Sequence, residues 1–271
     1  LPVLSTKVVK GVTERSDAFV GGFRDRRISI TAASRYGVTQ TSDLTIFPYY
    51  NKSGDKQGQK VRNVDKKMWF EGEKQKSVLF GQQLFTKGGK FVTIVEGEFD
   101  ALAAYQMLGN YPVVSVRTGA QGALGDCKEH FEWLDSFDSV VISFDSDEAG
   151  RKAAAEVAEL FGNKAKVMKH IDDCKDACDY LTQRLEPQFV SSWWAAEQFK
   201  PEGIVTMQDI RDRLLKPPEA GVPWCFPTLT ELTYGRRKGE LFGFGAGVGV
   251  GKTDIFTQQI AYDIDVLKIK V

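Results

Sequence analysis

The feature that most constrains this chain is the way its Val- and Ile-rich segments end in carboxylates. Residues 91–96 (PheValThrIleValGlu) finish at Glu96, and residues 139–145 (SerValValIleSerPheAsp) finish at Asp145. A helix-like segment follows each of them, and this alternation is typical of a buried parallel sheet. In an open α/β sheet, ligands bind at the carboxyl ends of the strands. The sequence therefore predicts an acidic site at that edge of the sheet.

The same rhythm of strand and helix extends over the block of residues 91–171. We expect further strands at 112–116 and 166–170, and helices at 100–108 and 148–161. Apolar residues recur at helical spacing in the second of these helices, as in a helix with one buried face. This block is the predicted α/β domain.

The carboxylates of this block have the spacing of a metal site. Asp145 and Asp147 are two residues apart on a segment expected to be extended, so their side chains point the same way. Asp100 lies one turn after Glu96. Convergent carboxylates need a cation, and hard oxygen ligands favour Mg²⁺ or Mn²⁺ over Zn²⁺. The pattern indicates a two-metal phosphoryl-transfer site, although Asp147 would also be an ordinary residue at the start of the following helix.

Four other polar residues near these motifs allow either a structural or a functional interpretation. Glu98 would point the same way as Glu96 if the strand continued, which makes it an alternative outer-shell ligand. Arg117 follows the strand at 112–116, where contact with a substrate is an alternative. His130 and His170 are expected at the surface or in packing, because no catalytic triad forms around them.

The charge distribution is polarised along the chain, although the formal net charge is zero. Residues 1–90 hold 17 Lys and Arg against 8 Asp and Glu, and residues 91–185 hold 9 against 17. A basic region is often only a solvated face. Beside an acidic metal-site pattern, it is better interpreted as a groove for a polyanion or for nucleoside triphosphates.

Composition and cysteine usage narrow the class of protein. No apolar run reaches the ~20 residues that span a bilayer, so we expect no membrane partner. The few, scattered cysteines are expected to be free thiols of a reducing compartment rather than zinc ligands, since Cys174 and Cys178 lack a second ligand pair at finger spacing. The chain begins with Leu1 and shows no secretory signal pattern, and we expect it to be a piece of a longer protein.

A second phosphate-binding pattern follows a break in the chain. Residues 205–215 have the pattern of a capped helix, and the Pro-rich segment 216–223 is the clearest linker. Residues 246–253 then have the P-loop pattern with alanine in place of the first glycine, and we expect a strand before it and a helix after it. The residues expected to contact a nucleotide through this loop are Ala246, Gly247, Gly249, Gly251, Lys252 and Thr253.

Together these motifs resemble a known family. The segments ValGluGlyGluPheAspAlaLeu, PheAspSerAspGluAlaGlyArgLysAla and CysLysAspAla (174–177) resemble the three acidic motifs of the TOPRIM domain. Their order, with the linker and the P-loop behind them, resembles the bifunctional primase–helicases of the bacteriophage T7 type, which include mitochondrial Twinkle. The resemblance runs from about residue 21 to the end of the sequence.

The resemblance implies roles for individual residues. The catalytic set is Glu96, Asp100, Asp145, Asp147 and Asp176, of which Glu96, Asp145, Asp147 and Asp176 would hold Mg²⁺ or Mn²⁺. The residues implied to hold incoming triphosphates and template are Lys60, Arg62 and Lys66.

The resemblance also implies a division of the chain. The implied parts are a mixed α+β basic RNA-polymerase subdomain (1–90), a TOPRIM domain with a parallel sheet (91–171), a helical tail (172–203), a linker helix and linker (204–224), and the truncated start of a RecA-like helicase domain (225–271). The family's zinc-binding module has no counterpart in this sequence.

The implied activity is that of a DNA primase, a nucleotidyltransferase that makes short RNA primers on single-stranded DNA, joined in the full protein to an NTP-dependent 5′–3′ DNA helicase. The implied partners are the template, the RNA primer, a replicative DNA polymerase and a ring of six or seven copies that docks through residues 205–215. The location would be the host cytoplasm for a phage protein, or mitochondria for a Twinkle relative. Two alternatives stay open: a non-catalytic Twinkle-like module for DNA binding and ring assembly, and a TOPRIM nuclease.

Overall fold

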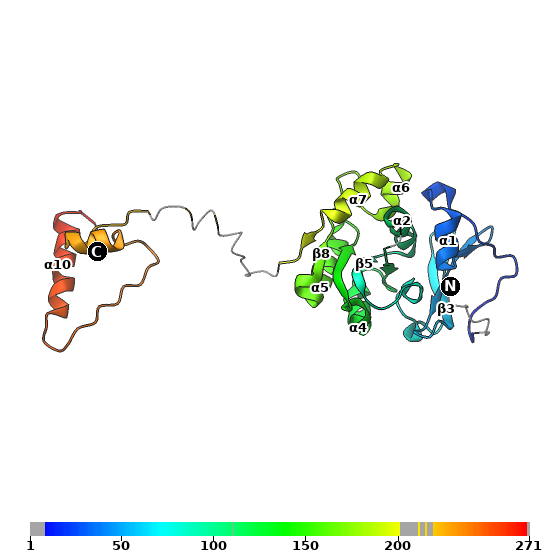
Figure 1. Cartoon of the computed structure of the whole chain (residues 1–271), viewed down its shortest axis with the longest axis horizontal. Coiled ribbons are helices and arrows are strands. Elements are labelled where there is room, and N and C mark those ends of the chain that lie inside the picture. Colours follow the sequence, from blue (N-terminus) through cyan, green and yellow to red (C-terminus); the bar gives the residue numbers. More distant parts are fainter. Residues whose placement is uncertain (1–8, 110, 201–210, 212–214, 216–218, 270–271) are drawn as a thin grey trace. The chain divides into compact units, whose positions relative to one another are not determined.

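The computed structural model describes residues 9–109, 111–200, 211, 215 and 219–269, which belong to two compact units (Figure 1). The first unit is Leu1–Glu202 and the second is Gly203–Val271. In the described residues, no helix is both long and apolar enough to span a lipid bilayer. The two units are described separately below.

The first unit begins with an antiparallel sheet of four strands, which follow one another in chain order. Ser29 caps the helix that precedes the sheet, because its side chain accepts a hydrogen bond from the amide of Ala32 at 3.2 Å. Gly37 ends that helix with a φ of 71°, a conformation that favours glycine. The elements are η1 (Arg24–Arg26), α1 (Ile30–Tyr36), β1 (Thr39–Gln40), β2 (Leu44–Tyr50), β3 (Lys56–Asn63), β4 (Met68–Gly72), η2 (Lys74–Lys76) and η3 (Gln82–Leu84).

A second sheet of five strands follows, in the order β6-β5-β7-β8-β9. Neighbours from β6 to β8 are parallel and β9 is antiparallel, which confirms the predicted parallel sheet. Its strands are β5 (Gly89–Val95), β6 (Val113–Ser115), β7 (Phe137–Ser143), β8 (Ala165–Val167) and β9 (Glu197–Gln198). The helical elements are α2 (Glu98–Leu108), η4 (Ala120–Gly122), α3 (Ala123–Glu129), α4 (Phe131–Leu134), α5 (Glu148–Phe161), η5 (Gly162–Lys164), α6 (Ala177–Thr182) and α7 (Glu186–Trp194).

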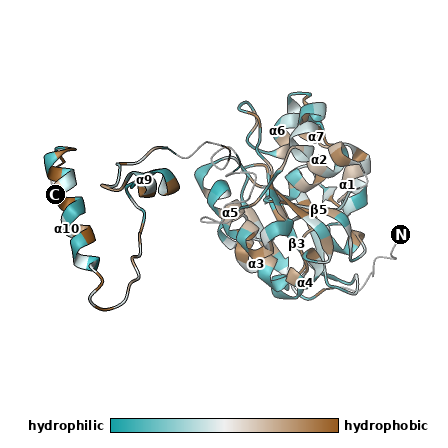
Figure 2. Cartoon of the chain, turned by 60° about the vertical axis from the view of Figure 1, so that its left-hand side comes forward, coloured by the Kyte–Doolittle hydropathy of each residue, from teal (hydrophilic) through white to brown (hydrophobic). Residues whose placement is uncertain are grey.

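Both faces of the parallel sheet are covered by helices, as its near-continuous apolar strands require. Ile94 and Ile142 belong to a core shared with α3, α4 and α5. Val95 and Val141 point to the other face and pack in a core with α2, α6 and α7. Figure 2 shows the hydrophobic residues gathered around β5, inside the unit. The second core continues into α1 and the antiparallel sheet, so the two sheets of this unit share one core.

The second unit contains α9 (Pro227–Thr233) and α10 (Lys252–Asp265). Arg236 forms an ion pair with Asp263 of α10, with its Nη1 at 2.7 Å from Oδ2. Gln259 connects α10 to the segment before α9, because its Oε1 accepts from the amide of Cys225 at 2.8 Å. These contacts hold α10 against the start of the unit.

Several element boundaries differ from the sequence-based predictions. β7 ends at Ser143, so Asp145 lies in the loop after the strand and not within it. The alternation of residues 59–67 predicts a strand over that range, but β3 ends at Asn63, because the chain turns there: the amide of Lys66 donates to the carbonyl of Asn63 at 3.0 Å, and Lys66 has a φ of 64°. The predicted strand at 166–170 is shorter and lies at Ala165–Val167.

The helix predicted after the P-loop is confirmed as α10, but the strand predicted before it is absent from the described residues 236–251. A strand exists only in a hydrogen-bonded ladder, and no described segment of this unit pairs with residues 240–246. Leu241 is 98% exposed there. The predicted linker helix at 205–215 falls almost entirely outside the described residues.

Candidate metal centre at the edge of the parallel sheet

A cleft of about 510 Å³ lies at the carboxyl edge of β5 and β7. One wall comes from the loops that follow these strands and includes Glu96, Asp100 and Asp145. The other wall comes from the antiparallel sheet and includes Lys60 and Met68. The cleft therefore places an acidic wall opposite a basic and apolar wall.

Glu96 follows the last residue of β5 and belongs to the acidic wall. Its Oε2 is buried and has no hydrogen-bond partner in the described part of the chain. Gly119 lies beside it with a φ of 68°, and a Cβ at Gly119 would be 3.6 Å from the Glu96 Oε1. A buried carboxylate oxygen without a donor is costly unless a ligand satisfies it.

Asp145 is held in place by a close approach of helix α5. A Cβ on Gly150 would lie 2.1 Å from the carbonyl oxygen of Asp145, a distance that no real Cβ can have. Only glycine at this position allows the first turn of α5 to pack on the Asp145 backbone. The glycine of the AspSerAspGluAlaGly motif is thus explained by the position of the aspartate.

Asp147 and Asp176 both cap helices. The Oδ1 of Asp147 accepts from the amide of Gly150 at 2.7 Å, and the Oδ1 of Asp176 accepts from the amide of Asp179 at 2.8 Å. The structural role foreseen for Asp147 at the start of a helix is therefore real. Each carboxylate uses one oxygen in its cap, and among the described residues no hydrogen bond takes the other oxygen.

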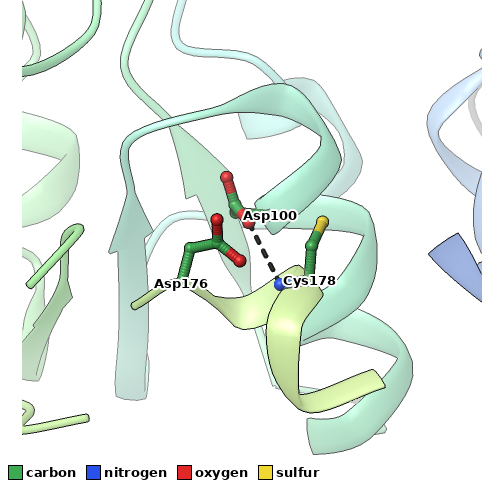
Figure 3. Close-up of side chains that lie close together, drawn as sticks. All are labelled: Asp100, Asp176 and Cys178. Atoms are coloured by element: carbon green, nitrogen blue, oxygen red, sulfur yellow. Dashed lines mark hydrogen bonds between the residues drawn. The ribbon is translucent and has the colours of Figure 1, made fainter. Parts of the chain in front are cut away.

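Asp100 and Asp176 meet although they are far apart in the sequence. An oxygen of each and the Sγ of Cys178 lie within 4.8 Å of one another (Figure 3). Asp100 projects from α2 and accepts from the amide of Cys178, at the start of α6, at 3.2 Å. This contact connects the first acidic motif to the third.

The carboxylates interact electrostatically as one cluster. Burial, and after it the charges of Glu96, Asp176 and Asp147, raise the pKa of Asp145 to about 7. Burial likewise raises the pKa of Asp100, with the charges of Asp176 and Asp145 next in importance. Both effects disfavour the charged form, and a cation would reverse them.

The donor set fits a hard divalent cation. Carboxylate oxygens dominate it, and one of them, the buried Oε2 of Glu96, has no hydrogen-bond partner among the described residues. Cys178 is the one soft donor near the cluster in the described residues, but burial and the charge of Asp100 raise its thiol pKa well above the usual value. Carboxylate oxygens are thus the donors that this cluster mainly offers to a cation.

Lys60 is engaged by a residue for which the sequence suggests only an alternative role, as an outer-shell metal ligand. Its ammonium forms an ion pair with Glu98, whose side chain is 4% exposed. The hydroxyl of Tyr49 donates to the same carboxylate oxygen at 2.5 Å. Glu98 is the first residue of α2 and not a strand residue, so it turns away from Glu96 toward the antiparallel sheet.

Arg62 and Lys66 lie in a neighbouring recess of about 310 Å³. Arg26 also lines this recess, and the guanidinium groups of Arg26 and Arg62 lie 4.3 and 5.4 Å from the ring centre of Phe99. Burial and the charge of Arg26 lower the pKa of Arg62. The three basic residues implied to hold triphosphates and template are therefore divided, with Lys60 at the carboxylates and the other two in the recess that Phe99 also lines.

Arg117 lines the cleft but is held by carboxylates on its own side. Its Nη2 lies 2.7 Å from the Oδ1 of Asp126 and also bonds Glu129, and its Nη1 donates to the carbonyl of Ser77 at 2.7 Å. Its side chain is 6% exposed. These ion pairs give Arg117 a structural role, and its contact with a substrate stays a prediction.

The residues of the predicted P-loop lie in the second unit. Gly251 precedes α10 with a φ of 86°, and the ammonium of Lys252 donates to the carbonyls of Ala246 at 2.9 Å and Gly247 at 2.8 Å. Thr253 lies in the first turn of α10. The structure thus brings the predicted loop residues into one turn at a helix start.

Three features of the site could not be read from the sequence. The pairing of Lys60 with Glu98, the contact of Asp100 with the start of α6, and the presence of Arg26 at the recess all join segments that are far apart along the chain. Only Gly150, the glycine of the second acidic motif, has a role that its residue type suggests without knowledge of distant contacts.

Comparisons with known proteins agree with this geometry. A Toprim-like family model matches residues 93–181. The DNA helicase/primase of Enterobacteria phage T3 is 33% identical over 220 residues, which cover 79% of this chain and 38% of that protein. The chain thus spans well under half the length of this relative.

Two solved structures are similar as well. The primase fragment of the bacteriophage T7 primase–helicase is 29% identical, with a TM-score of 0.64, over 72% of this chain and 82% of that one. A primase domain in a structure with the T7 lagging-strand DNA polymerase, an RNA/DNA hybrid and dTTP is 30% identical. Its TM-score is 0.62, and the match covers 68% of this chain and 95% of that one.

Proposed function

The chain belongs to the phage T7-type family of DNA primase–helicases, and on that premise we propose that it carries the family's primase activity. The reaction is the synthesis of short RNA primers on a single-stranded DNA template. The observation that carries the proposal is the cluster of partly unsatisfied carboxylates at the sheet edge, opposite a wall that contains Lys60.

The metal ligands are proposed to be Glu96, Asp145, Asp147 and Asp176, with Asp100 behind them on α2. In Asp147 and in Asp176, one carboxylate oxygen accepts the helix-cap hydrogen bond, and this bond fixes the direction of the second oxygen. Divalent cations bound there, Mg²⁺ or Mn²⁺, would lower the pKa of a 3′-hydroxyl and stabilise the pyrophosphate leaving group.

Glu96 is proposed to accept the proton of the attacking hydroxyl, because its buried Oε2 has no competing donor among the described residues. The hydroxyl oxygen attacks the α-phosphorus of the incoming ribonucleoside triphosphate. A phosphodiester bond forms as the bond to pyrophosphate breaks, and the proton passes to the carboxylate.

Different basic residues are proposed to bind the two anionic substrates, the triphosphate and the template. Lys60 faces the carboxylates and would neutralise part of the negative charge of the triphosphate. Arg62 and Lys66, with Arg26 beside them, would contact the template backbone in the neighbouring recess. The proposed domain limits are 1–90 for the basic subdomain, 91–171 for the TOPRIM domain and 172–203 for its helical tail.

The remainder is proposed to be the linker (204–224) and the start of a RecA-like helicase domain (225–271). Lys252 and Thr253 would contact nucleotide phosphates and Mg²⁺ through the P-loop. The helicase activity, the ring and its docking through residues 205–215 belong to the whole protein. So does contact with a replicative DNA polymerase, as in the T7 structure with a lagging-strand polymerase.

A priming assay with three arms tests the proposal. Single-stranded DNA is incubated with Mg²⁺ or Mn²⁺ and labelled ribonucleotides, without nucleotides, or with nucleotides and EDTA. Short RNA products in the first arm alone are expected. Loss of the DNA in the second arm would indicate a nuclease instead. DNA binding without synthesis in any arm would support the non-catalytic Twinkle-like module.

A further inference from the structure

The first turn of α2 contacts three separate parts of the site. Glu98 forms the ion pair with Lys60 at the cleft. Asp100 accepts from the amide of Cys178 and lies among the carboxylates. Phe99 stands between them in the sequence and lines the neighbouring recess. Successive residues of a helix point about 100° apart, so three consecutive side chains reach in three directions. Of these three residues, Phe99 is the one to which the proposed function gives no role.

The ring of Phe99 is fixed in the wall of the recess by aromatic packing. It is 8% exposed. It forms T-shaped pairs with Phe23 and with Phe47, each at 5.0 Å between ring centres. T-shaped contacts on a buried ring favour one orientation of that ring. The ring is therefore a rigid support for whatever lies against it.

Arg26 and Arg62, which we call the arginine pair, both lie against this ring. Their guanidinium carbons are 4.3 and 5.4 Å from its centre. The two residues come from η1 and β3, so the ring of α2 collects side chains from two distant segments. A cation is attracted to the face of an aromatic ring, and the planar guanidinium group also stacks on it. Phe99 thus brings two like charges to one wall of the recess.

No strong ion pair compensates the arginine pair in the described part of the chain. Arg62 forms neither an ion pair nor a side-chain hydrogen bond with another described residue. Arg26 lies 4.0 Å from Asp25, whose side chain is 79% exposed, and exposed pairs of this kind contribute little. The two charges also repel each other: after burial, the charge of Arg26 is the main cause that lowers the pKa of Arg62. Two half-buried positive charges in this state favour the binding of an anion.

We propose that Phe99 is a positioning residue that holds the arginine pair in place for the phosphate groups of the template. A free Arg side chain loses rotational freedom when it binds phosphate, and a ring that already holds the guanidinium group reduces this cost. Stacking occupies the face of the guanidinium group and leaves the N–H donors at its edge for phosphate oxygens. The inference rests on the proposed function, which places the template in this recess.

Binding of labelled single-stranded DNA, measured by fluorescence anisotropy, tests the proposal with Phe99→Leu in two backgrounds. In the wild-type background, Phe99→Leu should weaken binding about five-fold, the typical cost of ordering one or two long side chains. In the background Arg26→Gln/Arg62→Gln it should have no further effect, because the ring has no guanidinium group left to hold. The same loss in both backgrounds, or no loss in the wild-type background, would overturn the proposal.

The arginine pair itself is tested by salt dependence. For single-stranded DNA, each phosphate contact contributes about 0.7 to the slope of log affinity against log salt concentration. Arg26→Gln/Arg62→Gln should therefore lower that slope by roughly 1.4, as expected for two lost contacts. An unchanged slope would show that the arginine pair does not meet the template, and the role proposed for Phe99 would be wrong.

Two further variants separate the face of the ring from its packing. Phe189→Leu is the matched control, because Phe189 is a fully buried ring of the same core that does not line the recess. It should lower the Tm as Phe99→Leu does and leave DNA binding within about two-fold of wild type. Phe99→Met fills more of the vacated volume and should bind DNA as weakly as Phe99→Leu. Wild-type affinity in Phe99→Met would show that packing alone matters and would overturn the proposal.

Primer synthesis distinguishes this inference from the proposed function. Phe99→Leu should raise the KM for template about five-fold with a similar kcat, and the Tm increase on adding Mn²⁺ should not change. A lower kcat with an unchanged KM would show that the ring supports the metal site through α2 and would overturn the inference. Wild-type protein that binds DNA but makes no primers would contradict the proposed function alone. Wild-type protein that binds no DNA would contradict the placement of the template and this inference with it.

Discussion

Lys60 of β3 forms a buried ion pair with Glu98, the first residue of α2, and Tyr49 donates to the same carboxylate. This pair joins the antiparallel sheet to the parallel one at the mouth of the acidic cleft. It also fixes the ammonium of Lys60 opposite the proposed metal ligands. Lys60 is therefore both a structural partner and a charge that a triphosphate would meet.

Replacing Lys60 by Met should destabilise the protein, because it leaves the buried Glu98 carboxylate without its cation. Breaking a buried pair in this way costs about 3–5 kcal/mol. Urea unfolding measures the change. The double variant Lys60→Met/Glu98→Gln should recover most of the loss, since it leaves no unpaired charge. Equal destabilisation of the single and double variants would contradict this interpretation of the pair.

Local sequence was informative about the strands and much less so about which segments meet. The Val and Ile runs before Glu96 and Asp145 are continuous because both faces of their sheet are covered, and that pattern is local. Lys60 lies on β3 and Glu98 begins α2, and strand alternation indicates the face of a residue but not the residue opposite it. The strand expected before the P-loop illustrates the same limit, because a strand depends on a partner that local pattern does not specify.

The acidic cluster should make the metal-free protein less stable as the pH rises. The folded-state pKa of Asp145 is raised to about 7, so the folded protein holds a proton that the unfolded chain releases near pH 4. The contribution of this group to stability is fully present below pH ~4 and is lost as the pH rises through about 7. Asp145→Asn should therefore raise the Tm at pH 8 in EDTA, and by less at pH 5.

The exposed Asp138, at the other end of β7, offers the matched control. Asp138→Asn should leave the Tm in EDTA close to that of wild type at both pH values. Equal Tm shifts in the two variants, or a wild-type Tm in EDTA that rises between pH 5 and 8, would contradict the assignment.

Divalent cations should stabilise the protein more strongly at higher pH. Binding requires ionised carboxylates, so Mg²⁺ or Mn²⁺ must displace the protons that the cluster holds near pH 7. The Tm increase on adding the cation is expected to grow from pH 6 to pH 8. Asp100→Asn, which removes one negative charge next to Asp176, should reduce this increase. A Tm increase that is the same at every pH would place the cation elsewhere.

Gly150→Ala should damage the site through its geometry and not through charge. The added Cβ would lie 2.1 Å from the Asp145 carbonyl oxygen, so either α5 or the loop must move. We expect a loss of about 2 kcal/mol or more, as for overpacking in a core, together with weaker cation binding. Gly125 of α3 has open space around its Cβ position, and Gly125→Ala should instead stabilise by about 0.5–1 kcal/mol. Calorimetry with and without Mn²⁺ compares the two variants.

Primer synthesis by Asp145→Ala, beside wild type and Asp138→Ala, tests the central proposal most directly. Each protein receives single-stranded DNA, labelled ribonucleotides and Mg²⁺ or Mn²⁺, and template binding is measured in parallel by fluorescence anisotropy. Asp145 lines the acidic cleft, so its loss should abolish RNA products while template binding stays within about two-fold, because the basic recess that is proposed to bind the template phosphates is untouched. Asp138→Ala should behave as wild type. RNA products from Asp145→Ala at the wild-type level would contradict the metal centre proposed here.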